Sequence, residues 1–513
     1  MQEEKNTPLH RIAKSTSFIF AGTLVSLLIG FLTRILLVKI TTQKEYGIYA
    51  LSFTIVTMIT TISMLGLQEG VTRHLAHFKS KNNDEVVQNT IFSSIVIALV
   101  ASIPIAVALF LVSEIISTKI YSFSEMTNVL RIMAVTIPLM VLMNVIVSVY
   151  RAMNNTKIKI FLYDVFKPFS YLLFLGIAVI LSLSFINIIY LYTLSIILTF
   201  ILIWQYFIKK PPTFVYWKNM RLNQNTRDLL IYSVPLLAVS ILFTIMAWTD
   251  TLMLGYFKTA QNVASYNAAY PIAYLLSIVI NSIGYIYVPV VSELYSHNKT
   301  DELRIVNASA TKWCFMTTFP IFMLMVLFPE RILSFLYDIR YTDASFVLQI
   351  LAFGTVLNSY FGLNYYTLLS TGRSSFLLRC SLISALLNVG LNIILIPSYG
   401  MVGAAIASAF SFLLIEVYMT ITLYKSFKMH SFSISYLRFT FAVILLSLTA
   451  ISVRDIFMTT FQRSMILYSL FLFFYLLSIY CTKLLDKEDL LILRKTKIKI
   501  QGTITLIRNK LAI

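Results

Sequence analysis

Residues 90–112 read TIFSSIVIALVASIPIAVALFLV and contain no charged side chain. Because an α-helix rises about 1.5 Å per residue, a run of this length crosses a hydrocarbon core of about 30 Å. The run is continuous and does not alternate strictly with polar residues, which favours a helix over a strand of a membrane barrel. Working outward from it, the sequence predicts fourteen spans, at residues 16–38, 48–67, 90–112, 128–149, 161–182, 185–207, 229–254, 266–290, 313–329, 345–369, 376–396, 402–424, 438–457 and 464–482.

The overall composition indicates an integral membrane protein. Of the 513 residues, 58% are hydrophobic and 12% are charged, whereas a soluble surface needs roughly a quarter of its residues charged. The net charge of +19 is spread over short segments between apolar runs. It does not gather on a polar domain, so no nucleic-acid partner is expected. The three cysteines lie far apart, which argues against a disulfide framework or a zinc site.

The distribution of Lys and Arg predicts the orientation. With the N-terminus inside, 31 of the 41 basic residues fall in cytoplasmic segments and 8 in outer loops. Basic residues concentrate on the cytoplasmic side of membrane proteins, so both termini are expected in the cytoplasm. The C-terminal tail alternates basic with apolar residues, which fits an amphipathic segment on the inner leaflet and a solvated tail equally well.

The two halves of the chain are similar to each other. Arg34 precedes Tyr49 by 15 residues and Asp250 precedes Tyr266 by 16, and matching positions recur at offsets of 216–220. A repeat of six helices enters the membrane from the same side each time, which predicts two parallel, pseudo-symmetric lobes around a cavity. The predicted domains are a cytoplasmic N-tail at 1–15, an N-lobe at 16–207, a basic cytoplasmic loop at 208–228, a C-lobe at 229–424, two additional helices at 438–482 and a basic tail at 483–513.

Three stretches carry a family resemblance. They are RILLVKITTQKEYGIYAL with LGLQEGVTRHLA within 34–76, DTLMLGYF with VASYNAAY within 250–270, and LLSTGRSSF with LLNVGLNIILIPSYGMVGAAIAS within 368–408. They resemble the polysaccharide-transporter (Wzx-type flippase) family of the multidrug/oligosaccharidyl-lipid/polysaccharide exporter superfamily. The resemblance implies two six-helix lobes and two extra helices that open alternately to each side. It also implies movement of a polyprenyl-pyrophosphate-linked oligosaccharide from the inner to the outer leaflet.

Two charged residues at matching places in the two halves are the first site candidates. A charge within the hydrocarbon costs about 2.5–3.5 kcal/mol on insertion scales. Arg34 either binds the pyrophosphate of a lipid-linked sugar, because guanidinium binds phosphate bidentately, or snorkels to the outer interface. Asp250 is a candidate for ion coupling or for gating by a salt bridge to Arg34, and the alternative is a local cap or hydrogen bond.

Four further charged or amide side chains are candidates. Glu416 has apolar neighbours, so it is either a proton or sodium site or a hydrogen-bonded packing residue. Asn388 either faces the substrate cavity or forms hydrogen bonds between helices. Arg73 at the inner mouth either guides an anionic head group or reflects the positive-inside bias. Arg131, just inside its span, is a cavity candidate for which snorkelling is the favoured interpretation.

A polar stripe at helical spacing is the remaining candidate surface. Its residues are three or four positions apart and so lie near one helical face. They suit a cavity wall that stacks on sugars, or packing between helices. The stripe consists of Tyr266, Tyr270, Tyr274, Ser277, Asn281 and Tyr285.

The sequence contains no nucleotide-binding loop, metalloprotease motif or catalytic loop. We therefore expect a non-enzymatic flippase in the plasma membrane, without a cofactor and with H⁺ or Na⁺ coupling. Expected partners are the lipid-linked oligosaccharide, membrane lipids and glycan polymerase or glycosyltransferase machinery. The alternatives are a multidrug or organic-cation exporter of the same superfamily, a lipid II-type flippase, and a membrane-bound polysaccharide polymerase, which would need a large outer loop.

Overall fold

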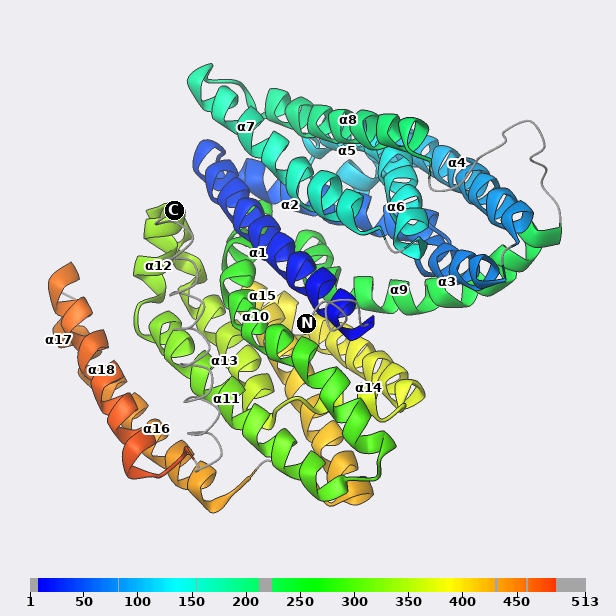
Figure 1. Ribbon diagram of the computed structural model, residues 1–513. Coiled ribbons are helices and arrows are strands. Elements are labelled where there is room, and N and C mark those ends of the chain that lie inside the picture. The colour runs from blue at the N-terminus through cyan, green and yellow to red at the C-terminus, as the bar shows by residue number, and fades with distance from the viewer. Residues whose placement is uncertain are drawn as a thin grey trace, which may run out of the picture. The chain divides into compact units, whose positions relative to one another are not determined.

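The computed structural model describes residues 8–81, 83–153, 155–211, 224–429, 432–457 and 460–485. Within these ranges the chain is helical and contains no strand, which confirms the predicted fold class (Figure 1). The helices are α1 Pro8–Ile40, α2 Gln43–Ser63, α3 Leu67–Ser80, α4 Asp84–Ile115, α5 Met126–Ala134, α6 Thr136–Ala152, α7 Lys167–Ile180, α8 Phe185–Lys209, α9 Gln224–Phe257, α10 Ala260–Ser296, α11 Thr300–Leu327, α12 Pro329–Leu336, α13 Ser345–Phe361, α14 Asn364–Ser370, α15 Ser374–Phe427, α16 Ile434–Ser452, α17 Arg454–Phe457 and α18 Phe461–Cys481. Two π-helical segments, Ile116–Ile120 and Lys159–Phe166, and a 3₁₀ segment, Ile339–Ala344, complete the order.

The helices account for the predicted spans. Twelve are long and apolar enough to cross a membrane, and the bent pair Thr226–Leu242 and Thr244–Phe257 adds one. The 54-residue α15 is interrupted by the non-helical Gly400 and therefore holds two spans, at 374–399 and 401–427. If the two parts of α15 are counted separately, the described residues hold fourteen candidate spans, and each predicted run overlaps one of them.

The break in α15 is a sharp turn that requires glycine. Gly400 has φ 56° and ψ −133°, a combination that L side chains rarely adopt. Nearby, a Cβ at Gly403 would lie 2.4 Å from the carbonyl oxygen of Leu395, so the two halves of α15 approach closely. Lys258 Nζ donates to the carbonyl oxygen of Pro397 at 2.8 Å and ties the turn to the loop before α10.

The chain divides into two compact units. Unit 1 comprises residues 1–271, 333–347 and 381–408, and unit 2 comprises 272–332, 348–380 and 409–513. These units follow packing and not the internal repeat, so the lobes at 16–207 and 229–424 stay a prediction. Parts of the predicted tails and loop, namely 1–7, 212–223 and 486–513, lie outside the described residues.

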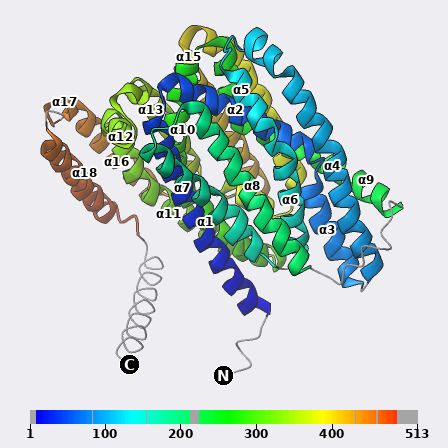
Figure 2. The ribbon, with the colours of Figure 1, turned by 90° about the horizontal axis from the view of Figure 1, so that it is seen from above.

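Unit 1 contains most of the first half of the chain. α7 lies between α1 and α8 (Figure 1), and α3 lies beside α4 (Figure 2). α9 packs against α2, α3 and α4. Residues of α1, α2, α7 and α9 come together around one cavity, where the candidate site is found.

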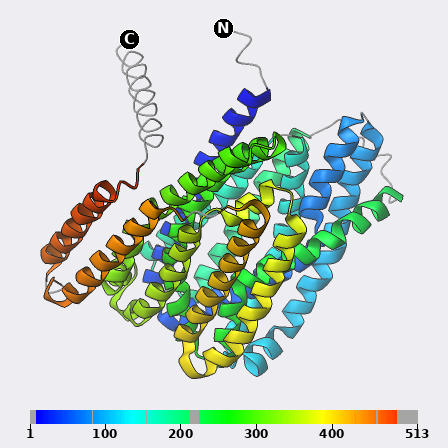
Figure 3. The ribbon, with the colours of Figure 1, turned by 90° about the horizontal axis from the view of Figure 1, so that it is seen from below.

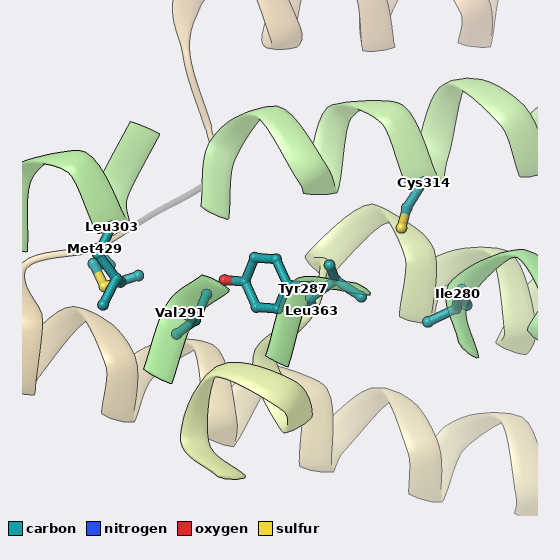
Figure 4. Close-up of a cluster of buried hydrophobic side chains, with 7 residues drawn as sticks. All are labelled: Ile280, Tyr287, Val291, Leu303, Cys314, Leu363 and Met429. Carbon is teal, nitrogen blue, oxygen red and sulfur yellow. The ribbon is translucent and has the colours of Figure 1, made fainter. Parts of the chain in front are cut away.

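Unit 2 is held together by an apolar core and by aromatic contacts. Tyr287 lies within a buried cluster that also includes Cys314 and Leu363 (Figure 4), and its hydroxyl donates to Asn307 Oδ1 at 2.8 Å. α16 and α18 lie side by side (Figure 3). The Tyr475 hydroxyl of α18 donates to the carbonyl oxygen of Met316 at 2.8 Å and fastens this pair to α11.

Candidate functional site

A cavity of about 200 Å³ lies inside unit 1. Its wall is built from residues of α1, α2, α6, α7, α8, α9 and α10 and includes two cationic side chains, Arg34 and Lys167. Much of the remaining wall is aromatic, from Tyr46, Tyr49, Phe53, Tyr171, Tyr192 and Trp248. A cavity with two cations and several rings suits an anionic group attached to a body that stacks on aromatic faces.

Arg34 is fixed on this wall by a main-chain group. It lies on α1, six residues before the end of the helix at Ile40, and its Nη1 donates to the carbonyl oxygen of Asn267 at 3.4 Å. The Tyr46 hydroxyl donates to the same oxygen at 3.4 Å. A guanidinium carries five N–H donors, so this contact leaves donors for a ligand. Arg34 therefore belongs to the cavity wall, and its phosphate-binding role stays a prediction.

Lys167 is a second cation of the cavity that the sequence analysis did not single out. It was counted with the basic residues of the inner segment, but the structure places it at the start of α7. Its Nζ lies 4.1 Å from the ring centroid of Tyr163. In the π-helical segment before α7, Lys159 pairs with Asp164 at 2.7 Å. The sequence feature that could have identified Lys167 is its position as a lysine inside an otherwise apolar run that includes Pro168.

Asp250 lies at the centre of a buried hydrogen-bond network. Its Oδ1 accepts from the Nδ2 atoms of Asn392 at 2.7 Å and Asn388 at 3.3 Å. Its Oδ2 accepts from the hydroxyls of Ser408, at 2.5 Å, and Tyr266. Within the described residues no ion pair joins Asp250 to Arg34. Asp250 is thus hydrogen-bonded locally, and Asn388 joins α15 to α9, while an ion-coupling role of Asp250 stays a prediction.

The same network contains an acceptor without a donor. Asn392 Oδ1 is buried and has no hydrogen-bond partner among the described residues, although its amide nitrogen donates to Asp250 and to Asn388 Oδ1. The Asn392 amide turns its nitrogen toward the carboxylate, so the unpaired oxygen belongs to a direct neighbour of Asp250. The described residues contain no group of three or more His, Cys, Asp or Glu arranged to hold a metal ion.

Glu416 forms a separate buried site in unit 2. Its Oε1 accepts from Asn358 Nδ2 at 2.9 Å, and its Oε2 accepts from Asn364 Nδ2 at 3.2 Å. Asn364 also donates to Thr420 Oγ1 at 2.8 Å. The two asparagines come from α13 and α14, and no spacing in the sequence connects them with α15. The sequence analysis therefore found the acid but missed both of its donors.

Arg73 and Arg131 have local partners and do not line the described cavity. Arg73 on α3 donates to the Tyr232 hydroxyl, and its guanidinium carbon lies 5.0 Å from the centroid of that ring. Arg131 on α5 pairs with Glu114 at 3.3 Å and donates to Ser113 Oγ at 3.1 Å. Both were proposed from sequence as cavity candidates, and the structure does not bring either together with Arg34.

The predicted tyrosine stripe of α10 does not line the described cavity either. Tyr266 is buried against Asp250, and Tyr270 stacks on Tyr266 with ring centroids 6.2 Å apart. Tyr274 and Asn281 belong to unit 2, where both are exposed and Asn281 Oδ1 accepts from the Tyr366 hydroxyl at 2.9 Å. The residue of α10 that lines the cavity is Asn267, one position from the stripe.

Comparisons with known proteins give two family matches. Residues 12–295, more than half of the chain, match the family model described as polysaccharide biosynthesis protein. Residues 235–394 match the model described as MatE. The chain is 30% identical over 189 residues to the probable low-salt glycan biosynthesis flippase Agl15 of Haloferax volcanii, covering 37% of this chain and 40% of that protein.

A second relative and two solved structures are also similar. The uncharacterized membrane protein MJ1068 of Methanocaldococcus jannaschii is 28% identical over 221 residues, or 42% of this chain and 44% of that one. Both curated matches thus span less than half of the relatives' lengths. The fold is similar to the lipid II flippase MurJ in an inward closed conformation, with TM-score 0.71, 14% identity and coverage of 92% and 99% of the two chains. It is also similar to an inward-facing multidrug resistance MATE family transporter of the MOP superfamily, with TM-score 0.69, 13% identity and coverage of 78% and 94%.

Proposed function

This chain belongs to the polysaccharide biosynthesis protein family, and from that premise we propose that it is a flippase for lipid-linked oligosaccharide. It would move a polyprenyl-pyrophosphate-linked glycan from the inner to the outer leaflet of the plasma membrane, without catalysing a reaction. The name of the Haloferax relative, a glycan biosynthesis flippase, supports this class of substrate. Glycosyltransferase or polymerase machinery would supply and consume the glycan.

The observation that carries the proposal is the pair of cations, Arg34 and Lys167, in the wall of a cavity among membrane spans. Two positive charges there attract an anionic pyrophosphate and repel an organic cation, which argues against the multidrug alternative. The cavity of about 200 Å³ is smaller than the roughly 300–1,000 Å³ of a drug-sized site. We therefore assign it to the pyrophosphate and the first sugar, with the tyrosine rings beside the sugar.

The proposed transport cycle is alternating access. The predicted lobes at 16–207 and 229–424 would rock about the cavity, so that the head group enters from the cytoplasmic side and leaves outside. Both termini would lie in the cytoplasm, and the lipid tail would stay in the bilayer. A ligand shifts the equilibrium between the two states only by its differential affinity for them. In this proposal the contacts of the pyrophosphate with the cavity cations differ between the two states and supply that difference.

We further propose that proton or sodium coupling uses Asp250, with Glu416 as a second candidate. Asp250 is buried, its four donors are neutral, and Asn392 Oδ1 beside it has no donor in the described residues. A small cation at this place would satisfy both the carboxylate and the amide oxygen. Glu416 has two neutral amide donors and lacks a comparable unpaired oxygen among the described residues.

The test is transfer of a fluorescent polyprenyl-pyrophosphate oligosaccharide in proteoliposomes. Hydrogen bonds to charged groups contribute about 1.5–3 kcal/mol, so Arg34→Ala and Lys167→Ala should each lower the transfer rate at least about tenfold. Arg34→Lys should retain part of it because the charge remains. Arg131→Ala is the matched control, because that arginine lies outside the cavity. Equal transfer by Arg34→Ala, Lys167→Ala and wild type at equal protein abundance would refute the proposal.

A further inference from the structure

Three consecutive buried residues at the start of α10, Ser265, Tyr266 and Asn267, contact three different functional groups. Successive residues of an α-helix point about 100° apart because a turn contains 3.6 residues. A short segment of one helix is therefore able to touch partners on three sides. All the contacts described below lie within unit 1.

Tyr266 contacts the buried carboxylate. Its hydroxyl donates to Asp250 Oδ2, the same oxygen that accepts from Ser408. The groups that contact this carboxylate come from α10 and α15, and all of them are neutral hydroxyls or amides. The strength of the Tyr266 bond therefore depends on whether Asp250 is ionised or neutralised by a proton or a cation.

Asn267 contacts the substrate-side cation. Its carbonyl oxygen accepts from Arg34 Nη1 and from the Tyr46 hydroxyl. Its side chain is held by the Val263 carbonyl oxygen at 2.9 Å and by Thr251 Oγ1 at 3.1 Å. The carbonyl that orients Arg34 is thus fixed relative to α10, and it moves if this turn of α10 moves.

Ser265 contacts a polar pair from two other segments. Its hydroxyl donates to Asp343 at 2.8 Å and accepts from Gln43 Nε2 at 2.7 Å. Gln43 begins α2, and Asp343 belongs to the 3₁₀ segment before α13. A Cβ at Gly47 would lie 1.8 Å from the carbonyl oxygen of Ala260, so α2 presses directly on the first residue of α10. Ser265 therefore anchors the turn that carries Tyr266 and Asn267.

We propose that Ser265, Tyr266 and Asn267 form a coupling element that transmits the charge state of Asp250 to the orientation of Arg34. Neutralising Asp250 weakens its bond to Tyr266 and lets the first turns of α10 shift. The Asn267 carbonyl shifts with them, which changes the donors that Arg34 presents to the cavity. Affinity for a pyrophosphate group therefore depends on Asp250, and by linkage pyrophosphate changes the ion affinity of Asp250 by the same factor. This inference rests on the proposed function.

The experiment measures binding of radiolabelled inorganic pyrophosphate to the detergent-purified full chain by equilibrium dialysis. Coupled sites commonly change each other's affinity about 5- to 150-fold, so Asp250→Asn should change the dissociation constant at least about fivefold. In a Tyr266→Phe background the same substitution should change it less than about twofold. Thr249→Ala on α9 is the matched control. It also removes a buried hydroxyl, which bonds the Ile245 carbonyl oxygen, but spares the Tyr266 bond and the coupling element, so the Asp250→Asn effect should persist there.

Two results would overturn the coupling element alone. One is pyrophosphate binding that Asp250→Asn leaves unchanged, and the other is an Asp250→Asn effect of equal size with and without Tyr266→Phe. Two other results would contradict the proposed function itself. In one, wild type binds no pyrophosphate, and in the other, Arg34→Ala binds it as well as wild type. Either result would also overturn the coupling element. If Asp250→Asn does not elute as a monodisperse peak, Asp250→Ser replaces it in the same comparison.

Discussion

At the scale of single residues, the main contrast is between the two buried carboxylates. Asp250 accepts four hydrogen bonds and lies beside the unpaired oxygen of Asn392, whereas Glu416 accepts two amide bonds. Hydrogen bonds to a carboxylate favour its charged form, and burial disfavours it. The two acids therefore have different surroundings although the sequence alone gave both the same candidate role.

Glu416→Gln tests whether this acid couples transport to an ion. Glutamine keeps one oxygen, which accepts from one of the Asn358 and Asn364 amides, and the other asparagine can turn its own oxygen toward the new NH₂ group, so folding should be retained. If Glu416 is a coupling site, the variant should lose the pH or sodium dependence of transport in proteoliposomes. Glu416→Ala is the control for packing, because it leaves two amides unpaired and should lower stability by about 1–3 kcal/mol. An unchanged ion profile of Glu416→Gln removes this residue from the coupling proposal.

Sequence reasoning at this scale found the residues that are costly to bury and missed their partners. Arg34, Asp250 and Glu416 were singled out because a charge within a span needs an explanation. Lys167 lies six residues inside the predicted span 161–182, and it was missed although a lysine there is as unusual as Arg34. The role of the Asn267 carbonyl could not be predicted from sequence, because every residue has a main-chain carbonyl and only packing determines which one contacts Arg34.

At the scale of elements, close approach of helices depends on particular glycines. α2 and α10 touch at Gly47 and Ala260 with no room for a side chain. The sequence analysis used Gly47 as part of the family resemblance, but the resemblance does not say which helix it faces. The predicted span of the second helix, 48–67, also crosses a break, because α2 ends at Ser63 and α3 begins at Leu67.

Gly47→Ala should separate α2 from α10 and disturb the residues around the cavity. Overpacking of this kind costs about 1–3 kcal/mol, so we expect a lower unfolding temperature in detergent and slower transfer. Gly176→Ala on α7 is the matched control, because a Cβ there meets nothing within 4 Å. That variant should be neutral or slightly stabilised, since alanine favours a helix by about 1 kcal/mol over glycine. Equal unfolding temperatures of Gly47→Ala and Gly176→Ala would contradict the close contact between α2 and α10.

Gly400→Ala tests the turn within α15. The backbone conformation at this position costs a residue with a side chain about 1–3 kcal/mol, so the variant should unfold at a lower temperature. Gly390→Ala lies in the same helix and its Cβ meets nothing within 4 Å, which makes it the control. If both substitutions have the same effect on the unfolding temperature, the turn does not depend on glycine.

At the scale of the whole molecule, the number of spans was predictable and the site was not. Span length is a property of a continuous run, so each predicted run, including 313–329 and 464–482, overlaps a candidate membrane helix. The cavity depends on side chains that are distant in sequence, from Arg34 to Asn267. The division into two compact units likewise follows packing, and it does not follow the boundaries suggested by the repeat.

An even number of spans, fourteen in the prediction, would place both ends of the given chain on one side of the membrane. After replacement of Cys314, Cys380 and Cys481 by serine, single cysteines introduced before residue 8 and after residue 485 should react with a membrane-impermeant maleimide only in inside-out vesicles. This follows from the even number of spans and the positive-inside bias. Labelling of the two ends from opposite sides would show that one span is missing or extra.

The aromatic wall of the cavity has an optical consequence. Trp248 lines it together with Arg34 and Lys167, so its indole senses the polarity and charge of whatever occupies that space. In a variant whose other three tryptophans are changed to phenylalanine, ultraviolet emission would report occupancy directly, without a dye attached to the protein or to the glycan. The chain thus contains its own spectroscopic probe, placed where the head group would arrive.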